Sequence, residues 1–130
     1  MPTEPGVWEP GKVVAPDEKS LARFARAVER SPDNLAAELD EGDIRSSASL
    51  MQLDESAWAC LADLDTAMLE ALARFFTLAE MQLPGWEGGK RSPVIYIVRA
   101  LKSRDAFSAD LRKWIKANTD NRFLPYGSAL

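Results

Sequence analysis

Apolar side chains recur at helical spacing over most of this chain of 130 residues. Within 17–30 they fall at i, i+3, i+4 and i+7, which predicts an amphipathic helix capped by Asp17. The stripe consists of Leu21, Phe24, Ala25 and Val28. A Ser-Pro pair at 31–32 predicts the start of a shorter helix that Gly42 ends, and a serine-rich connection follows over 43–53.

The longest predicted helix spans residues 55–83, between Asp54 as its cap and the breaker Pro84-Gly85. One broad face of this helix is almost entirely apolar when the residues are set at about 100° intervals. That face carries Trp58, Leu61, Leu64, Met68, Leu69, Leu72, Phe75, Phe76, Ala79 and Leu83. So wide an apolar face is typical of the central helix of a bundle.

The last third of the chain predicts two helices and a tail. Residues 84–92 are rich in glycine, which excludes regular structure there. The run 94–98 has high β propensity, but its continuation favours helix, so we expect a helix over 93–103, with a strand paired across a dimer as the alternative. A further helix is predicted over 105–118, and the apolar tail from residue 119 is expected to fold back onto these two helices.

The first sixteen residues differ from the rest of the chain. They contain four prolines and two glycines, so residues 1–16 are predicted to be an extended arm. Trp8 is its expected anchor, on the core of the same chain or on a partner. The fold prediction is therefore all-α: an irregular bundle of four to five helices around the 55–83 helix, forming a single helical domain over 17–130.

Composition narrows the chemistry that this chain can perform. It has no histidine and one cysteine, Cys60, which excludes a Cys/His zinc site, a Ser-His-Asp triad and an internal disulfide. We expect no metal and no other cofactor. No apolar run is long enough to span a bilayer, and no stretch near the start resembles a signal peptide, so a cytoplasmic location is expected.

Charge is divided unevenly along the chain. Residues 1–83 carry a net charge of −9 and residues 84–130 carry +5. Two packed halves that neutralise each other, or assembly through complementary faces, would account for this division. A phosphate or nucleic-acid surface on the basic half is the alternative.

Two basic stretches are candidate anion sites. Gly88, Gly89, Lys90, Arg91 and Ser92 precede a predicted helix, where free amides, two cations and a hydroxyl can bind phosphate or a carboxylate. The second stretch interleaves Arg112, Lys116 and Arg122 with aromatic residues, a composition that can hold single-stranded nucleic acid. For both stretches, the alternative to an anion site is a charged surface that contacts only solvent.

Asp65 is the one acid predicted to lie on the apolar face of the long helix. A buried carboxylate needs a cation or hydrogen-bond donors. We therefore expect Asp65 to pair with an arginine of the basic half, foremost Arg99, Arg91 or Arg122, and to accept a second bond from Tyr96 or a backbone amide.

These features favour a non-enzymatic regulatory or accessory protein that acts by binding another protein or itself. The supporting features are the proline-rich arm with Trp8, the bipolar charge and the lack of a recognisable catalytic set. The alternative function is phosphate or nucleic-acid binding by the basic C-terminal half, through Arg112, Lys116 and Arg122.

Overall fold

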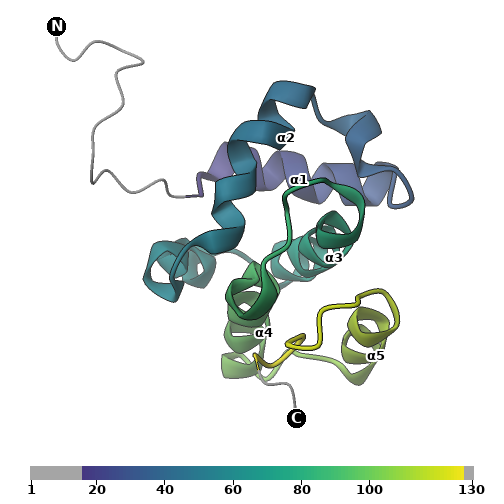
Figure 1. Ribbon diagram of the computed structural model, residues 1–130. Coiled ribbons are helices and arrows are strands. Elements are labelled where there is room, and N and C mark those ends of the chain that lie inside the picture. The colour runs from purple at the N-terminus through teal and green to yellow at the C-terminus, as the bar shows by residue number, and fades with distance from the viewer. Residues whose placement is uncertain (1–15, 128–130) are drawn as a thin grey trace, which may run out of the picture.

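The computed structural model describes residues 16–127, and over this range the chain forms helices without any strand (Figure 1). The α-helices are α1 (Glu18–Arg30), α2 (Glu41–Ser47), α3 (Thr66–Gln82), α4 (Pro93–Ser103) and α5 (Ala109–Ala117). Shorter 3₁₀ segments join them: η1 (Leu35–Glu38), η2 (Ala48–Gln52), η3 (Glu55–Asp63) and η4 (Gly89–Arg91). The all-α prediction is confirmed. The predicted arm, with Trp8, lies outside the described residues apart from Pro16.

Helix α3 is the centre of the bundle. It packs against α1 on one side and α4 on the other, with α5 and the tail on the α4 side (Figure 1). Its buried residues cover most of the helix surface: Leu69, Ala71, Leu72, Ala73, Phe75, Phe76, Thr77, Ala79 and Glu80. A helix with so wide a buried face is the expected core element of a small bundle.

An aromatic cluster fills the space around α3. Phe24 of α1 stacks on Phe75 with ring centroids 4.5 Å apart, and Phe76 meets Trp58 edge-on at 5.6 Å. Trp86 comes from the loop after α3, is fully buried beside Phe24 and Phe75, and donates from Nε1 to the Ile44 carbonyl at 2.9 Å. Such pairs add specific geometry to apolar burial, so this cluster fixes α1, α2 and the loop onto α3.

The prediction of one continuous helix over 55–83 is wrong. Residues 55–63 form the 3₁₀ segment η3, and Leu64 and Asp65 are extended before α3 begins at Thr66. The break occurs because Asp65 is an N-cap: its Oδ1 accepts from Met68 N at 2.8 Å. A carboxylate that binds the free amides of a first turn favours a new helix start over helix continuation.

Two predicted boundaries near the start of the chain are also wrong. Ser31 ends α1 instead of beginning a helix, and η1 starts at Leu35, whose amide donates to Gln82 Oε1 at 2.8 Å. Gly42 lies inside α2, because Asp40 accepts from Asp43 N and begins that helix ahead of the glycine. The serine-rich connection is therefore largely helical.

The C-terminal elements follow the prediction more closely. Helix α4 over 93–103 is confirmed, and the strand alternative is excluded. The tail folds back, with Leu124 buried and the Tyr126 ring packed edge-on against Phe107 at 6.1 Å. Among the described residues, every helix is too short or too polar to cross a membrane.

Candidate functional site

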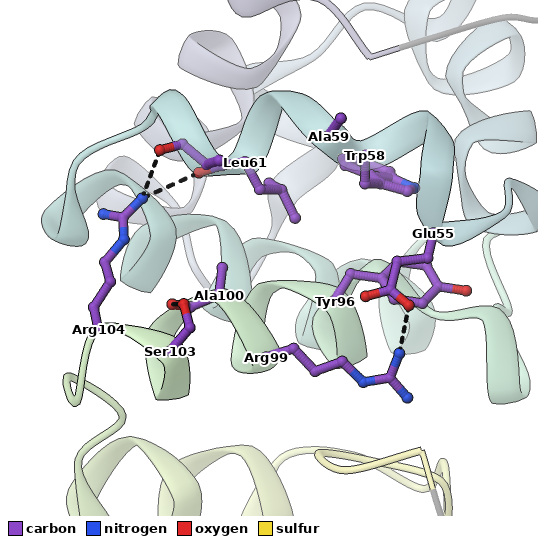
Figure 2. Close-up of a pocket in the computed structure, with 10 residues that line it drawn as sticks. Glu55, Trp58, Ala59, Leu61, Tyr96, Arg99, Ala100, Ser103 and Arg104 are labelled. Carbon is purple, nitrogen blue, oxygen red and sulfur yellow. Dashed lines mark hydrogen bonds and ion pairs between the residues drawn. The ribbon is translucent and has the colours of Figure 1, made fainter.

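A pocket of about 410 Å³ lies between η3 and α4 (Figure 2). We call it the η3–α4 groove. Residues from η3 form one wall: Glu55, Trp58, Ala59, Leu61 and Ala62. Residues on and just after α4 form the other: Tyr96, Arg99, Ala100, Ser103 and Arg104.

Small side chains keep the η3–α4 groove open. Ala59 and Ala62 of η3 and Ala100 of α4 are among the residues that line it. A methyl group at each position leaves room that a larger side chain would fill. Because a 3₁₀ helix has weaker hydrogen-bond geometry than an α-helix, the η3 wall is also the more deformable of the two.

One end of the groove is polar. Arg99 Nη1 donates to Glu55 Oε1 at 2.6 Å, and the Arg99 guanidinium lies 5.9 Å from the centre of the Tyr96 ring. Burial raises the pKa of the Tyr96 hydroxyl, and the Glu55 carboxylate raises it further, so Tyr96 is a neutral hydrogen-bonding group there. The Arg99–Glu55 pair is half-exposed and contributes little to stability, which leaves Arg99 free to exchange partners.

At the other end of the groove, Arg104 connects α4 to η3. Its Nη2 donates to the carbonyls of Leu61 and Ala62, each at 3.2 Å, where η3 ends (Figure 2). The carbonyls at the end of a helix lack partners within the helix. Arg104 therefore ties η3 to the end of α4 through a charge-assisted contact.

Trp58 is the unusual residue of the groove. Its side chain is 2% exposed and packs on Phe76, yet Nε1 is buried without a hydrogen-bond partner. The backbone at Trp58 is non-helical, with φ −102° and ψ 21°, which kinks η3 at this point. An unpaired buried N–H costs about 1–3 kcal/mol, so a contact that supplies an acceptor gains that amount.

Most polar side chains of the groove are hydrogen-bond donors. Arg99 and Arg104 donate, and the Tyr96 hydroxyl can donate as well. Among the described residues, no group of three or more acidic or thiol side chains is placed to hold a metal ion.

Fold and groove together define a small all-α protein with a donor-rich surface groove. Comparison of the chain with protein-family models, with curated proteins and with solved structures finds no match in any of the three.

The expected Asp65–Arg99–Tyr96 cluster is wrong. Asp65 is exposed and caps α3, whereas Arg99 pairs with Glu55. Asp65 lies on the apolar face only if residues 55–83 form one continuous helix. The chain is extended at Leu64, so the helical spacing from Trp58 and Leu61 does not continue to Asp65. Tyr96 and Arg99 do lie together, but in the η3–α4 groove.

The loop predicted to bind an anion holds an internal carboxyl group. Glu80 of α3 accepts from Gly88 N at 3.2 Å and from Asn121 Nδ2 at 3.0 Å, both through Oε1. Gly89 has a positive φ of 55°, and Ser92 is fully buried as the N-cap of α4. The loop is thus joined to the protein's own acid.

The two cations of that loop lie elsewhere. Lys90 is exposed, and Arg91 Nη1 donates to the Gln52 carbonyl at 3.1 Å and lies 3.9 Å from Asp54 Oδ1. The pairs Arg91–Asp54 and Arg99–Glu55 both join the basic half of the chain to the acidic half. Part of the charge division is therefore neutralised within the molecule.

The predicted C-terminal basic residues are not gathered into one site. Arg112 lines a pocket of about 330 Å³ with Lys102 and Tyr126, whereas Lys116 is exposed on α5. Arg122 lies over the Phe123 ring, 5.5 Å from its centre, and lines a different pocket.

Three residues that make important contacts in the structure were not predicted from the sequence. Glu80 follows Leu72 and Phe76 at intervals of four residues, so its position on the apolar face could have been found by the argument applied to Asp65. The burial of Trp86 is indicated only weakly, by a tryptophan standing in a glycine-rich loop. Nothing in the sequence indicates the contacts of Arg104, because they depend on where η3 ends.

Proposed function

We propose that this protein is a non-enzymatic regulatory or accessory protein that binds another protein, or a second copy of itself, through the η3–α4 groove. The observation that carries the proposal is the donor-rich rim of the groove, where Arg99, Arg104 and Tyr96 surround a pocket of about 410 Å³. A partner backbone that offers carbonyl oxygens can accept hydrogen bonds from these side chains.

The polar ends of the groove favour the same kind of partner. Arg99 and Arg104 outnumber the single carboxylate of Glu55, so the groove attracts an acidic or carbonyl-rich segment. Ala59, Ala62 and Ala100 leave space for one large partner side chain. A cytoplasmic location and self-association belong to this proposal as well.

Site-specific photo-crosslinking tests the proposal. A benzophenone amino acid replaces Ala59, which is exposed on the groove wall, and in a matched protein it replaces Ala36, which is exposed on η1 and does not line the groove. We expect discrete adducts with a protein chain from position 59 and none from position 36. Equal labelling from both positions would show that the groove is not the contact surface.

A binding variant supplies the second test. Ala100→Met narrows the groove with a side chain that suits a helix, and Ala36→Met is its control. We expect Ala100→Met to abolish the adduct from position 59 while the circular dichroism of the helices stays unchanged. An unchanged adduct would contradict the proposal.

Nucleic-acid binding by the basic half is the competing function, and salt dependence separates the two. Oligonucleotide affinity through Arg112 and Lys116 would fall steeply with salt, because binding releases counterions. We expect no oligonucleotide complex at physiological salt. A salt-sensitive complex that Arg112→Glu weakens would favour the competing function.

A further inference from the structure

We propose that a separate pocket, where α4, α5 and the tail meet, binds a small phosphate monoester. This pocket has a volume of about 330 Å³ and shares no lining residue with the η3–α4 groove. We call it the tail pocket. Its polar lining residues are Lys102, Asp105, Ser108, Arg112 and Tyr126. A ligand there gives the protein a second binding site beside the surface proposed for a protein partner.

Two cations of the tail pocket have no acidic partner. Lys102 stands in the last turn of α4, and Arg112 stands near the start of α5. Within residues 16–127 neither of them forms an ion pair, although Asp105 lines the same pocket. With Asp105 counted, the lining side chains carry a net charge of +1. An excess of positive charge in one depression favours an anionic ligand.

The position of Arg112 on its helix adds to this excess. Helix α5 begins at Ala109, so Arg112 lies in the first turn, where the helix dipole disfavours a cation. An anion bound by Arg112 offsets that unfavourable interaction. Ser108, the N-cap of α5, lines the same pocket; its Oγ accepts from Leu111 N at 3.1 Å, and its hydroxyl proton remains available to donate to the anion.

The folded-back tail positions the other cation. Lys102 Nζ lies 4.8 Å from the centre of the Tyr126 ring, and this ring packs edge-on against Phe107 at 6.1 Å. A lysine already held over an aromatic ring loses less side-chain freedom when it binds an anion. Tyr126 is 44% exposed, so its hydroxyl is accessible as a further donor. All the groups that contact the ligand are therefore in place at the surface.

The lining side chains select a phosphate monoester among anions. A monoester carries a charge of about −1.5 to −2 at pH 7, which matches two cations, whereas each phosphodiester of a nucleic acid carries one charge. Asp105 repels a bare phosphate but can accept a hydrogen bond from a ligand hydroxyl. The volume is near the lower end of the range for small-molecule sites, about 300–1,000 Å³. The ligand class is therefore a small hydroxylated phosphate monoester, such as a polyol phosphate.

A ¹⁵N NMR titration of the full chain with glycerol 3-phosphate tests the proposal. Ethyl phosphate, dimethyl phosphate and glycerol are the comparison ligands, all at matched ionic strength. We expect saturable shifts of the amides of Asp105, Ser108 and Arg112, with no shift at Ala36 on η1. Ethyl phosphate should bind more weakly because it has no hydroxyl for Asp105, and dimethyl phosphate and glycerol should give no saturable shift. Equal binding of the diester dimethyl phosphate would overturn the proposal.

Two variants with the same change of charge locate the binding. Arg112→Gln should weaken glycerol 3-phosphate binding by about tenfold or more, the loss expected for one charge-assisted hydrogen bond. Lys116→Gln is the matched control, because Lys116 is exposed on the same helix and does not line the tail pocket. Equal weakening by both variants would show diffuse electrostatic attraction and overturn the site. Circular dichroism checks that both variants keep their helices.

Further samples keep the result independent of α5 and of the η3–α4 groove. Lys102→Gln removes the cation from α4 and should weaken binding as Arg112→Gln does; unchanged binding would contradict a site formed by both cations. Ala100→Met should leave phosphate binding unchanged, because Ala100 lines only the groove. A phosphoserine peptide that binds more tightly than glycerol 3-phosphate would place the phosphate on a protein and overturn the small-molecule ligand.

Discussion

Glu80 Oε1 accepts a hydrogen bond from Asn121 Nδ2 at 3.0 Å, and this contact joins the middle of the bundle to the C-terminal tail. The same oxygen accepts from Gly88 N, and Asn121 also donates to the Gly89 carbonyl at 2.9 Å. Oε2 is buried and makes no hydrogen bond of normal geometry. One carboxyl group therefore holds three segments together while half of it is unsatisfied.

This arrangement predicts a pH dependence with a definite sign. Burial raises the pKa of Glu80, although the Ser92 hydroxyl, the Gly88 amide and the Asn121 amide lower it. Because the pKa is higher in the folded than in the unfolded state, stability falls as pH rises from the ordinary value of 4.5 to the raised folded value. Above the pKa of Glu80 in the folded protein, the loss of stability is complete and no longer changes with pH.

Glu80→Gln should remove this loss, because the amide keeps an acceptor for Gly88 N and carries no charge. Urea unfolding of both proteins across the acid-to-neutral range measures the effect. We expect the stability of the variant relative to the parent to increase through the window that begins near 4.5. The difference between the two proteins isolates Glu80 from other titrating groups, and a difference that does not change with pH would contradict the prediction.

Asp65 is predicted to matter as a helix cap. Asp65→Ala removes the acceptor for Met68 N and should lower the free energy of unfolding by about 1 kcal/mol. Asp65→Asn should be milder, because the amide oxygen can still accept. A loss of about 3–5 kcal/mol, the cost of breaking a buried ion pair, would contradict the cap assignment.

Asp65 also shows where sequence reasoning succeeds and fails. The stripe in 17–30 and the Ser-Pro start of 93–103 each fixed a helix, because periodicity and capping residue agreed. Around Asp65 they competed: apolar residues continue at helical spacing on both sides, while the aspartate offers a cap. The spacing of apolar residues alone cannot detect such a break, because that spacing stays helical on both sides of Asp65.

The η3–α4 groove was less predictable than the fold. Tyr96 and Arg99 were selected, but for contact with Asp65, because nothing in the sequence places Glu55 opposite Arg99. The unpaired Trp58 Nε1 is a consequence of tertiary packing, and the sequence gives no sign of it. Glu80 was within reach of sequence reasoning, as its spacing from Phe76 shows.

Gly88 is predicted to be indispensable for a steric reason. A Cβ at this position would lie 2.7 Å from Ser92 Cα, and backbone atoms cannot yield as a flexible side chain can. Gly88→Ala should therefore cost about 1–3 kcal/mol and disturb the Ser92 cap of α4. Gly85→Ala is the control, because its Cβ would meet nothing within 4 Å although its φ is +84°.

Amide hydrogen exchange separates these two glycines. Only Gly88→Ala should speed exchange at the start of α4, where Val94 N donates to Ser92 Oγ at 3.3 Å. The control should lose stability only through its backbone conformation. Equal exchange at Val94 in both variants would show that the close approach of Gly88 to Ser92 is not required.

The last prediction compares the two arginines of the groove, which differ in what they contact. Arg104 donates to the Leu61 and Ala62 carbonyls, whereas Arg99 pairs with a half-exposed carboxylate. Arg104→Gln should cost about 1.5–3 kcal/mol, the range for hydrogen bonds to a charged group. Arg99→Gln should cost about 1 kcal/mol or less, as exposed ion pairs do.

The exchange pattern tests the reason for this difference. Because Arg104 ties the end of η3 to α4, Arg104→Gln should speed amide exchange in η3 while the buried amides of α3 stay protected up to global unfolding. Arg99→Gln should leave η3 protection close to that of the parent. If both variants loosen η3 equally, the Arg99–Glu55 pair holds η3 against α4 as firmly as Arg104 does, and the difference argued from their contacts is wrong.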